Sequence, residues 1–493
     1  KLPAKRDLAP QDKVQSYFWI GISILFFVVL LFTRSRSGLV GFAVADIAFW
    51  GLMFWKTRDF ARIRLPFVIC HVSFVIVVFL NGTSIDSIDR WFRPLSPSPA
   101  TSEATPSGYA APLLEYGGTE SGTIRKYVWQ GAIAAWASTT KTRLIGTGTE
   151  TFAFAFYQYR PREHNLTSEW DFLYNKAHNE YLNYLTTTGL FGLGSYLLII
   201  GVFIVWYVKR ISEPNTFVSF ALFAGWVSIL VTNFFGFSVV ILQLFFFLFP
   251  AMVLVNMQST SAYYTRPFRV PRFTVWVVSV ACLVLLVMLI RMWWADFLFA
   301  KGYRGARLGQ YQQALQSLTS AIAMNPTEPL YHDEAAAALS LLVSVAIAGR
   351  DATTAASLAR ESIKENDRAI GISPANVNYW KTRTKILYSF APFDPTFTKA
   401  AITALEKARE LSPKDPKIPY NLAVLYGQNG ESQKAIELLK AAVDLKPNYR
   451  DAYWALHIFY KETGSPELAK SVLSEYLTKV DPNDRDFAEA RTQ

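Results

Sequence analysis

Long apolar runs alternate with polar stretches along the first part of this chain of 493 residues, and the alternation stops beyond Ala295. A helix needs roughly 20 apolar residues to cross a bilayer, and several runs approach that length. We therefore expect an all-α protein in which a polytopic transmembrane helix bundle precedes a soluble C-terminal domain. The seven expected spans are residues 17–33, 38–55, 65–81, 189–208, 216–235, 239–256 and 273–294.

Basic residues are concentrated in three short loops between the expected spans. The positive-inside rule makes these loops cytoplasmic. The expected organisation is a cytoplasmic segment at 1–16, three spans in 17–81, a large extracytoplasmic loop at 82–188, four spans in 189–294 and an extracytoplasmic domain at 295–493. The basic residues are Lys56, Arg58, Arg62, Arg64, Lys209, Arg210, Arg266, Arg269 and Arg272.

Composition adds few further constraints. The formal charge of +11 is explained mainly by topology, so it does not indicate a nucleic-acid partner. The two cysteines lie inside apolar runs and form no disulfide framework. The chain begins with Lys1 rather than Met, from which we expect further N-terminal spans to precede it.

Arg34 and Arg36 break the charge rule, because they lie at the expected outer end of the first span. One interpretation is that both side chains extend to the membrane interface. The other is a cationic clamp on a lipid phosphate, since guanidinium groups bind phosphate bidentately.

The extracytoplasmic loop opens with a Pro- and Gly-rich stretch, residues 94–122, typical of a flexible linker. Helical spacing then predicts a helix at 124–139. Arg125 and Lys126 near its start oppose the helix macrodipole, so either solvent or a bound diphosphate compensates them. The Gly-Thr-Gly at 146–148 predicts a tight turn, and the aromatic residues of 152–159 are expected to seat the loop on the bilayer.

His178 begins a polar segment directly before an apolar run. Helical spacing from His178 predicts an amphipathic helix that leads to Gly189 and holds His178 and Asn179 at the membrane surface. His164 is interpreted as polar surface. Asp46 and His71 are the ionisable residues expected within the membrane. Their depths differ by about 9 Å, which argues against a direct pair.

The C-terminal part carries small and large apolar residues at a period of 34 residues, with prolines after them, which indicates tetratricopeptide repeats. The segment between Pro326 and Pro374 is longer than one repeat and predicts an irregular unit. Such arrays bind protein partners in a concave groove or serve as structural caps. The repeat positions are Gly309, Ala314, Leu318, Ala321 and Pro326; Ala401, Leu405, Ala408 and Pro413; Gly430, Ala435, Leu439, Ala442 and Pro447; and Ala469 with Pro482.

Over residues 17–256 the chain resembles the O-antigen ligase and O-antigen polymerase superfamily of bacterial glycan transferases. The resemblance rests on Ser-Arg-Ser-Gly at 35–38, the helix from Arg125 to Trp129 with Gly-Thr-Gly, and the His-Asn motif at 178–179 with its glycines up to 192. Ser37 stands where the family usually has a glycine or another small residue after the arginine, and because serine lacks the backbone freedom of glycine, we expect a different local turn.

The resemblance implies transfer of a glycan from a polyprenyl-diphosphate carrier to a glycan, lipid or protein acceptor in the bacterial cytoplasmic membrane, without a metal or nucleotide. Arg36 and Arg125 would stabilise the diphosphate leaving group. His178 would be a general base or would hydrogen-bond the diphosphate. Arg34, Asn179 and Lys126 are candidate substrate-binding residues.

Alternatives remain within and outside this class. A ligase, a polymerase and a protein O-oligosaccharyltransferase are not separated by the sequence, and the repeats favour a protein acceptor. A membrane-anchored tetratricopeptide scaffold without catalysis would need only one anchoring helix. A transporter is disfavoured because the expected spans hold few ionisable residues.

Overall fold

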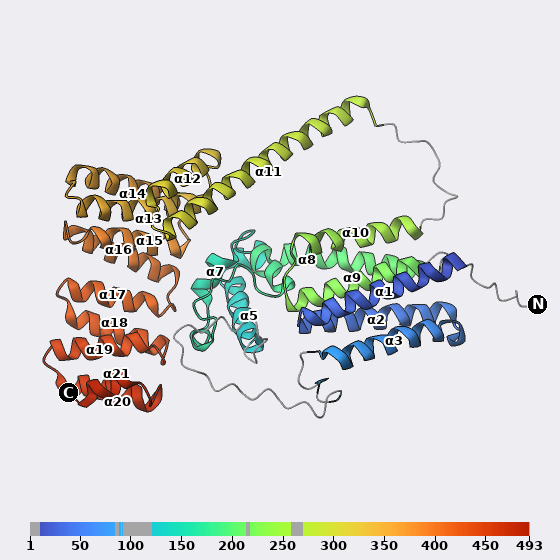
Figure 1. Cartoon of the computed structure of the whole chain (residues 1–493), viewed down its shortest axis with the longest axis horizontal. Helices are drawn as coiled ribbons and strands as arrows, with labels where there is room; N and C mark the ends of the chain where they lie inside the picture. The colour runs from blue at the N-terminus through green and yellow to red at the C-terminus, as the bar shows by residue number, and fades with distance from the viewer. Residues whose placement is uncertain are drawn as a thin grey trace, which may run out of the picture. The chain divides into compact units, whose positions relative to one another are not determined.

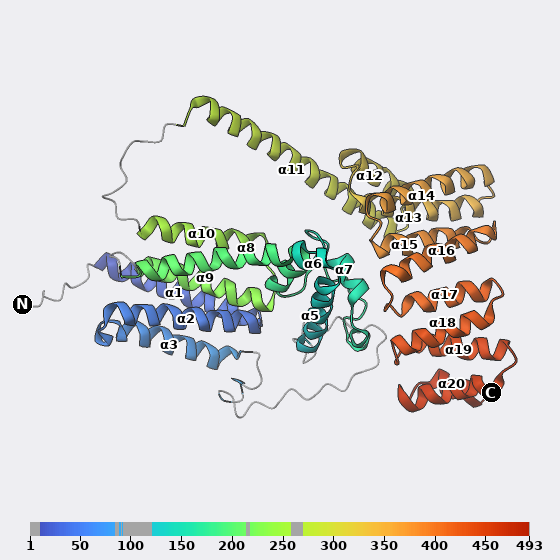
Figure 2. The ribbon, with the colours of Figure 1, turned by 180° about the vertical axis from the view of Figure 1, so that it is seen from behind.

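The computed structural model describes residues 10–83, 88–89, 91, 121–212, 217–257 and 270–492, and these contain helices and no strand. The expected all-α fold is confirmed. The chain forms two compact units, drawn in Figure 1 and from behind in Figure 2. We call Lys1–Phe152 with Tyr174–Tyr264 the membrane unit, and Ala153–Leu173 with Thr265–Gln493 the solenoid unit.

The membrane unit is built from long apolar helices and two shorter ones, α5 and α6. Aromatic side chains fill the core between α8, α9 and α10, where the buried Trp226 donates its indole N–H to the Phe246 carbonyl at 2.9 Å. That bond satisfies the one polar atom of a large buried ring. The helices are α1 (Pro10–Phe32), α2 (Arg36–Thr57), α3 (Phe60–Asn81), α5 (Ser121–Ala137), α6 (Thr140–Ile145), α8 (Glu180–Arg210), α9 (Phe217–Phe235) and α10 (Val240–Met257); α7 (Phe152–Tyr159) follows α6.

Among the described residues, seven helices are long and apolar enough to cross a membrane. Six of them match expected spans. The first expected span is helix α1, although its described apolar stretch, Phe18–Phe32, is shorter than the others. The seventh, Pro329–Ala348, is α13 of the solenoid unit. There the buried His332 and Asp333 bond to side chains of the neighbouring helix α14, so we assign α13 to the solenoid.

The expectation that Asp46 and His71 are too far apart to pair is wrong. Nε2 of His71 lies 3.0 Å from Oδ2 of Asp46, and its Nδ1 lies 2.8 Å from the Phe67 carbonyl. Both helices begin earlier than the apolar runs suggested, at Arg36 and Phe60. Asp46 is therefore residue 11 of the 22 in α2, and His71 is residue 12 of the 22 in α3. In antiparallel helices of equal length, both positions fall at the same depth.

The solenoid unit stacks antiparallel helix pairs, and α11 leads into the first pair (Figure 1). The apolar helix α11 continues beyond its expected end at residue 294 and buries Ala295, Gly302 and Ala306. The helices are α11 (Arg272–Arg307), α12 (Tyr311–Met324), α13 (Pro329–Ala348), α14 (Ala352–Ile372), α15 (Val377–Phe390), α16 (Thr396–Leu411), α17 (Lys417–Gln428), α18 (Ser432–Leu445), α19 (Arg450–Glu462), α20 (Pro466–Lys479) and α21 (Arg485–Thr492).

The alanines and leucines among the repeat positions identified in the sequence lie in the solenoid core. Small residues at these points let paired helices approach closely, and stacking covers faces that one repeat cannot bury. The longer unit between Pro326 and Pro374 consists of the extended helices α13 and α14. The alanines and leucines, which are at most 2% exposed, are Ala314, Leu318, Ala321, Ala401, Leu405, Ala408, Ala435, Leu439, Ala442 and Ala469.

Residues 153–173 of the expected extracytoplasmic loop pack on the repeats. Asn165 donates to the carbonyls of Lys414 and Leu445, and Lys446 donates back to the Asn165 carbonyl at 2.7 Å. Tyr157 joins the solenoid core, so this aromatic does not seat the loop on a bilayer. His164 is fully buried and is not polar surface. The sequence pattern could not show this, because the buried face is completed by repeats about 250 residues away.

Candidate functional site

The elements that carry the candidate residues meet around the C-terminal end of α9. On one side, α2 packs so closely that a Cβ on Gly41 would lie 2.8 Å from Cγ2 of Thr232. On another, the Trp129 ring of α5 meets the Phe234 ring edge to face at 5.7 Å. Just beyond α9, the Phe237 ring contacts that of His178. One short segment of chain therefore touches α2, α5 and the start of α8.

Arg34 and Arg36 lie at the turn between α1 and α2. Arg34 has a positive φ of 51°, and Ser35 caps α2 by accepting the Gly38 amide at 3.0 Å. Arg36 is the first residue of α2, and both arginine side chains are exposed. Since Gly41 packs against Thr232 near the end of α9, the start of α2 lies at the same end of the bundle as His178.

Arg125 and Lys126 lie in the second turn of α5 (Ser121–Ala137). The sequence predicted this helix at nearly the same position, residues 124–139. Arg125 is half-buried, Lys126 is exposed, and Arg125 precedes Trp129 by one turn. The hydroxyl of Thr186 in α8 lies 3.1 Å from the Ala132 carbonyl in the middle of α5. Helix α5 is thus attached to α9 through Trp129 and to α8 through Ala132.

The Gly-Thr-Gly turn holds α8 at a break in that helix. Gly189 inside α8 has φ 65° and ψ −163°, which interrupts the helical hydrogen bonds. The freed carbonyls of Thr186 and Thr187 accept the amides of Thr147 and Gly148, each at 2.9 Å. A Cβ on Gly189 would collide with the Leu144 backbone. This turn is therefore a backbone bracket that only glycine permits.

His178 precedes α8 instead of lying on it, so the expectation of an amphipathic helix containing His178 is wrong. Its φ is 52°, a left-handed conformation that is uncommon outside glycine and enriched in histidine. The imidazole is half-buried and meets the rings of Tyr174 at 5.7 Å and Phe237 at 5.2 Å, both edge to face. Backbone strain of this kind is concentrated at functional sites.

Asn179 explains why the helix starts where it does. It is 2% exposed and accepts the Leu182 amide at 3.0 Å, which makes it the N-cap of α8. Asparagine is among the best N-cap residues because its oxygen satisfies an amide that has no helical partner. Substrate binding by Asn179 stays a prediction.

Glu180 was missed by the sequence reasoning. It is 5% exposed, and its carboxylate accepts the Ser238 amide at 3.1 Å and the Gln243 side chain at 3.3 Å. It therefore ties the start of α8 to the segment between α9 and α10, next to the Phe237 that contacts His178. An acidic residue directly after the His-Asn pair, at the first helical position, was the available signal.

A shallow apolar groove of about 330 Å³ opens beside these residues. It faces the region where α8 and α9 meet, and the Tyr181 hydroxyl donates there to the Leu230 carbonyl at 3.0 Å. The groove has the chemistry to accept a hydrocarbon chain. Its lining residues are Tyr181, Leu230, Val231, Phe234 and Phe235.

Comparison with protein families identifies both parts of the chain. The family model of the O-antigen ligases matches residues 21–197, and a tetratricopeptide repeat model matches residues 398–457. The resemblance inferred from the sequence is confirmed: the chain is a multi-pass membrane protein with an O-antigen ligase domain and C-terminal tetratricopeptide repeats. This match indicates an O-antigen ligase-like function.

Individual curated proteins match a short part of the chain. The chain is 34% identical over 96 residues to DnaJ homolog subfamily C member 3 of Rattus norvegicus, which covers 20% of this chain and 19% of that protein. The Bos taurus protein is 33% identical over 108 residues, covering 22% and 21%. The chain thus spans about a fifth of the length of the curated relatives it matches.

Solved structures are similar at low identity. A crystal structure of MamA protein is 17% identical with a TM-score of 0.30, covering 38% of this chain and 91% of that one. A thermophilic tetratricopeptide protein of Thermus thermophilus, TTC0263, is 18% identical with a TM-score of 0.30, covering 40% of this chain and 100% of that one.

Proposed function

We propose that the protein transfers a glycan from a polyprenyl-diphosphate carrier to an acceptor hydroxyl at the outer face of the bacterial cytoplasmic membrane. The observation that carries the proposal is the meeting of α2, α5 and the start of α8 at the end of α9. It brings the arginine-bearing helix starts and His178 to one end of the membrane unit, beside an apolar groove suited to a lipid chain.

The electrostatics of this end suit a diphosphate. A helix N-terminus exposes unsatisfied amides that favour anions, and α2 presents such an end with Arg36 as its first residue. Arg125 adds a second guanidinium from α5. In the reaction, the bond between the anomeric carbon and the phosphate oxygen breaks, and its electron pair leaves with the diphosphate. Guanidinium groups stabilise that developing charge without the help of a metal.

His178 is the group that we propose as the general base, because the reaction releases a proton that must be taken up. The acceptor oxygen attacks the anomeric carbon and loses its proton, which the neutral imidazole takes up. Direct displacement of this kind inverts the anomeric centre. The two aromatic edges and the left-handed backbone hold the ring in one orientation, and Glu180 positions the segment against which the ring packs.

The side of the membrane that the site faces is inferred from the positions of the basic loops. Nζ of Lys56 at the end of α2 donates to the Ser212 carbonyl after α8 at 2.7 Å, which supports a common side for these two basic loops. The positive-inside rule makes that side cytoplasmic. The opposite end, with His178, then faces outwards.

Glycan transfer by the purified full chain in proteoliposomes, with a polyprenyl-diphosphate-linked oligosaccharide as donor, tests this function. Removal of the imidazole should abolish transfer. Because alanine tolerates a left-handed backbone poorly, His178→Asn is the better variant, since asparagine accepts that conformation. His457→Asn in the repeats, where the ring hydrogen-bonds to the Ala469 carbonyl, is the matched control. Full transfer by His178→Asn, at a protein yield equal to the control, would refute the role of His178.

The same assay separates the acceptor classes. Transfer to a second glycan indicates a polymerase, transfer to a lipid-linked saccharide indicates a ligase, and transfer to a peptide hydroxyl indicates a protein O-oligosaccharyltransferase. A chain that bound the donor but transferred no glycan in the presence of any acceptor would instead be a scaffold.

A further inference from the structure

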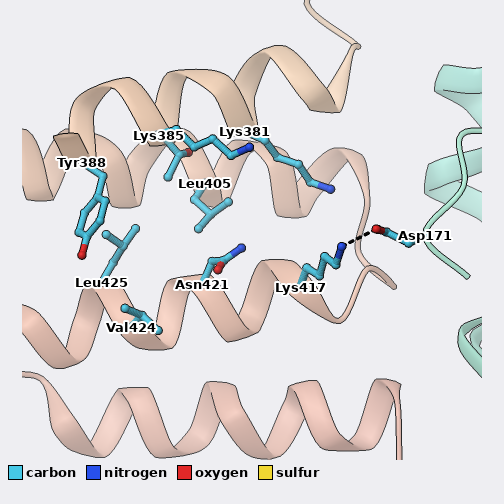
Figure 3. A pocket seen from close by; sticks show the side chains of 10 residues that line it. Asp171, Lys381, Lys385, Tyr388, Leu405, Lys417, Asn421, Val424 and Leu425 are labelled. Carbon is cyan, nitrogen blue, oxygen red and sulfur yellow. Dashed lines mark hydrogen bonds and ion pairs between the residues drawn. The ribbon is translucent and has the colours of Figure 1, made fainter. Parts of the chain in front are cut away.

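A pocket of about 320 Å³ lies in the solenoid unit between α15 and α17. Its size is at the lower end of ligand-binding pockets, roughly 300–1,000 Å³. Leu405, Val424 and Leu425 contribute apolar surface, and three of the four charged residues that line the pocket are lysines (Figure 3). All of its lining residues belong to the solenoid unit.

Four polar side chains face one another across the pocket in two helical pairs. Lys381 and Lys385 are one turn apart on α15, and Lys417 and Asn421 are one turn apart on α17. Residues four apart share a helix face, so each helix presents two donors to the other (Figure 3). Ammonium and amide groups in this arrangement favour carboxylates over cations.

The charges at the pocket are only partly compensated. Lys381 pairs with the buried Asp415, with Nζ and Oδ2 2.6 Å apart. Lys385 and Asn421 are exposed and make no hydrogen bond or ion pair through their side chains with any residue that the structure describes. They are therefore available to an external acceptor.

Lys417 already holds a carboxylate from a distant part of the sequence. Its Nζ forms an ion pair with Asp171 (Figure 3), which belongs to the loop segment packed on the repeats. The Asp171 side chain is half exposed. The pair shows that a carboxylate carried on a peptide segment fits this end of the pocket, and because it is exposed, another carboxylate can replace it at small cost.

We propose that this pocket binds an acidic peptide segment of a protein partner. One carboxylate of the peptide takes the place of Asp171 at Lys417, and a second is held by Lys385 and Asn421, while an apolar side chain covers Leu405, Val424 and Leu425. A peptide is favoured over an acidic sugar because the pocket combines apolar surface with separated donors, and because the carboxylate present there is already a peptide one. The binding is independent of glycan transfer.

Fluorescence anisotropy with the full chain in detergent micelles tests the proposal. The probe is a fluorescein-labelled peptide of repeated Leu-Glu-Asp units, and the neutral comparison is its Leu-Gln-Asn counterpart. The acidic peptide should bind more tightly, and added salt should weaken its binding because the charges are exposed. Equal binding of the two peptides would overturn the proposal.

Three variants sharpen the test. Lys385→Met keeps the apolar stem and removes the charge, and should weaken binding by roughly three- to tenfold. Lys399→Met, an exposed lysine of α16 outside the pocket, should bind like the wild type. Asp171→Asn should tighten binding, since it removes the internal competitor. Unchanged affinity in Lys385→Met, or in Asp171→Asn, contradicts the proposed site.

A competition experiment excludes the sugar alternative. Unlabelled acidic peptide should displace the probe, and oligogalacturonate at the same carboxylate concentration should not. Stronger displacement by the oligogalacturonate would assign the pocket to an acidic glycan and overturn the peptide proposal.

Discussion

Replacing Gly189 with alanine should dismantle the bracket that holds α5 and α6 against α8. At φ 65° and ψ −163°, a backbone conformation that is essentially restricted to glycine, an alanine costs about 1–3 kcal/mol from backbone strain alone. Its Cβ would also collide with the backbone of Leu144, which cannot move aside as a flexible side chain would.

The collision endangers two further interactions. The amides of Thr147 and Gly148 each lie 2.9 Å from the carbonyls of Thr186 and Thr187, and each bond contributes about 0.5–1.5 kcal/mol. Together with the backbone strain, the total is about 2–6 kcal/mol. The cost rises if the freed carbonyls lie within lipid, where no water replaces the lost donors.

Gly194→Ala is the matched control on the same helix, because nothing lies within 4 Å of a Cβ at that position. An alanine in a regular helix is favoured over glycine by about 1 kcal/mol, so this variant should be neutral or slightly more stable. Thermal unfolding in detergent, followed by tryptophan fluorescence, measures both. The reasoning is refuted if Gly189→Ala unfolds at the same temperature as Gly194→Ala.

Three further predictions follow from buried polar groups. Asn179→Ala removes the N-cap of α8 and should lower the stability of the protein by about 1 kcal/mol. Asn179→Ser keeps a capping oxygen and should be as stable as the wild type. If this serine variant is nevertheless inactive in glycan transfer, Asn179 also contacts the substrate. Lys381→Met removes the ion-pair partner of the buried Asp415, which keeps only the Lys417 amide and the more distant charge of Arg160. It should destabilise the solenoid unit by up to about 3–5 kcal/mol, and the double variant with Asp415→Asn should recover most of the lost melting temperature. Burial and the neighbouring Arg160 lower the pKa of His164 to about 3, so the folded state binds fewer protons than the unfolded state from about pH 6.5 down to 3. Stability should therefore fall on acidification, by about 2 kcal/mol between pH 6.5 and 5; His164→Leu should flatten this dependence in pH-resolved melting curves, and a parallel slope in the variant would contradict the assignment.

Much of the architecture could be predicted because it is encoded in local patterns. The spacing of Trp129 and Ile133 located α5, and the positions of Ala435 and Leu439 located a repeat, since burial of one helix face imposes a period on the sequence that forms it. The His-Asn motif likewise pointed to the end of the bundle where α2, α5 and α8 meet.

The errors occurred where partners lie far apart in the chain. Asp46 and His71 pair because their helices start earlier than the apolar runs do, and a hydropathy pattern does not mark a capped helix start. The error at His178 is instead local: the Asn179 side chain caps the first turn of α8, so the helix begins after His178. Glu180 has no visible partner in the sequence, since Ser238 and Gln243 follow it by about 60 residues.

The sequence by itself determined the helices, the membrane-spanning character of the first part and the repeat period of the second, because each follows from how neighbouring residues share water or lipid. Only the tertiary structure decided that the Gly-Thr-Gly turn fastens a broken helix, that residues 153–173 pack on the repeats, and that Asp171 reaches Lys417. These interactions are made by single backbone groups and side chains across long stretches of chain, and they leave no periodic trace in the sequence.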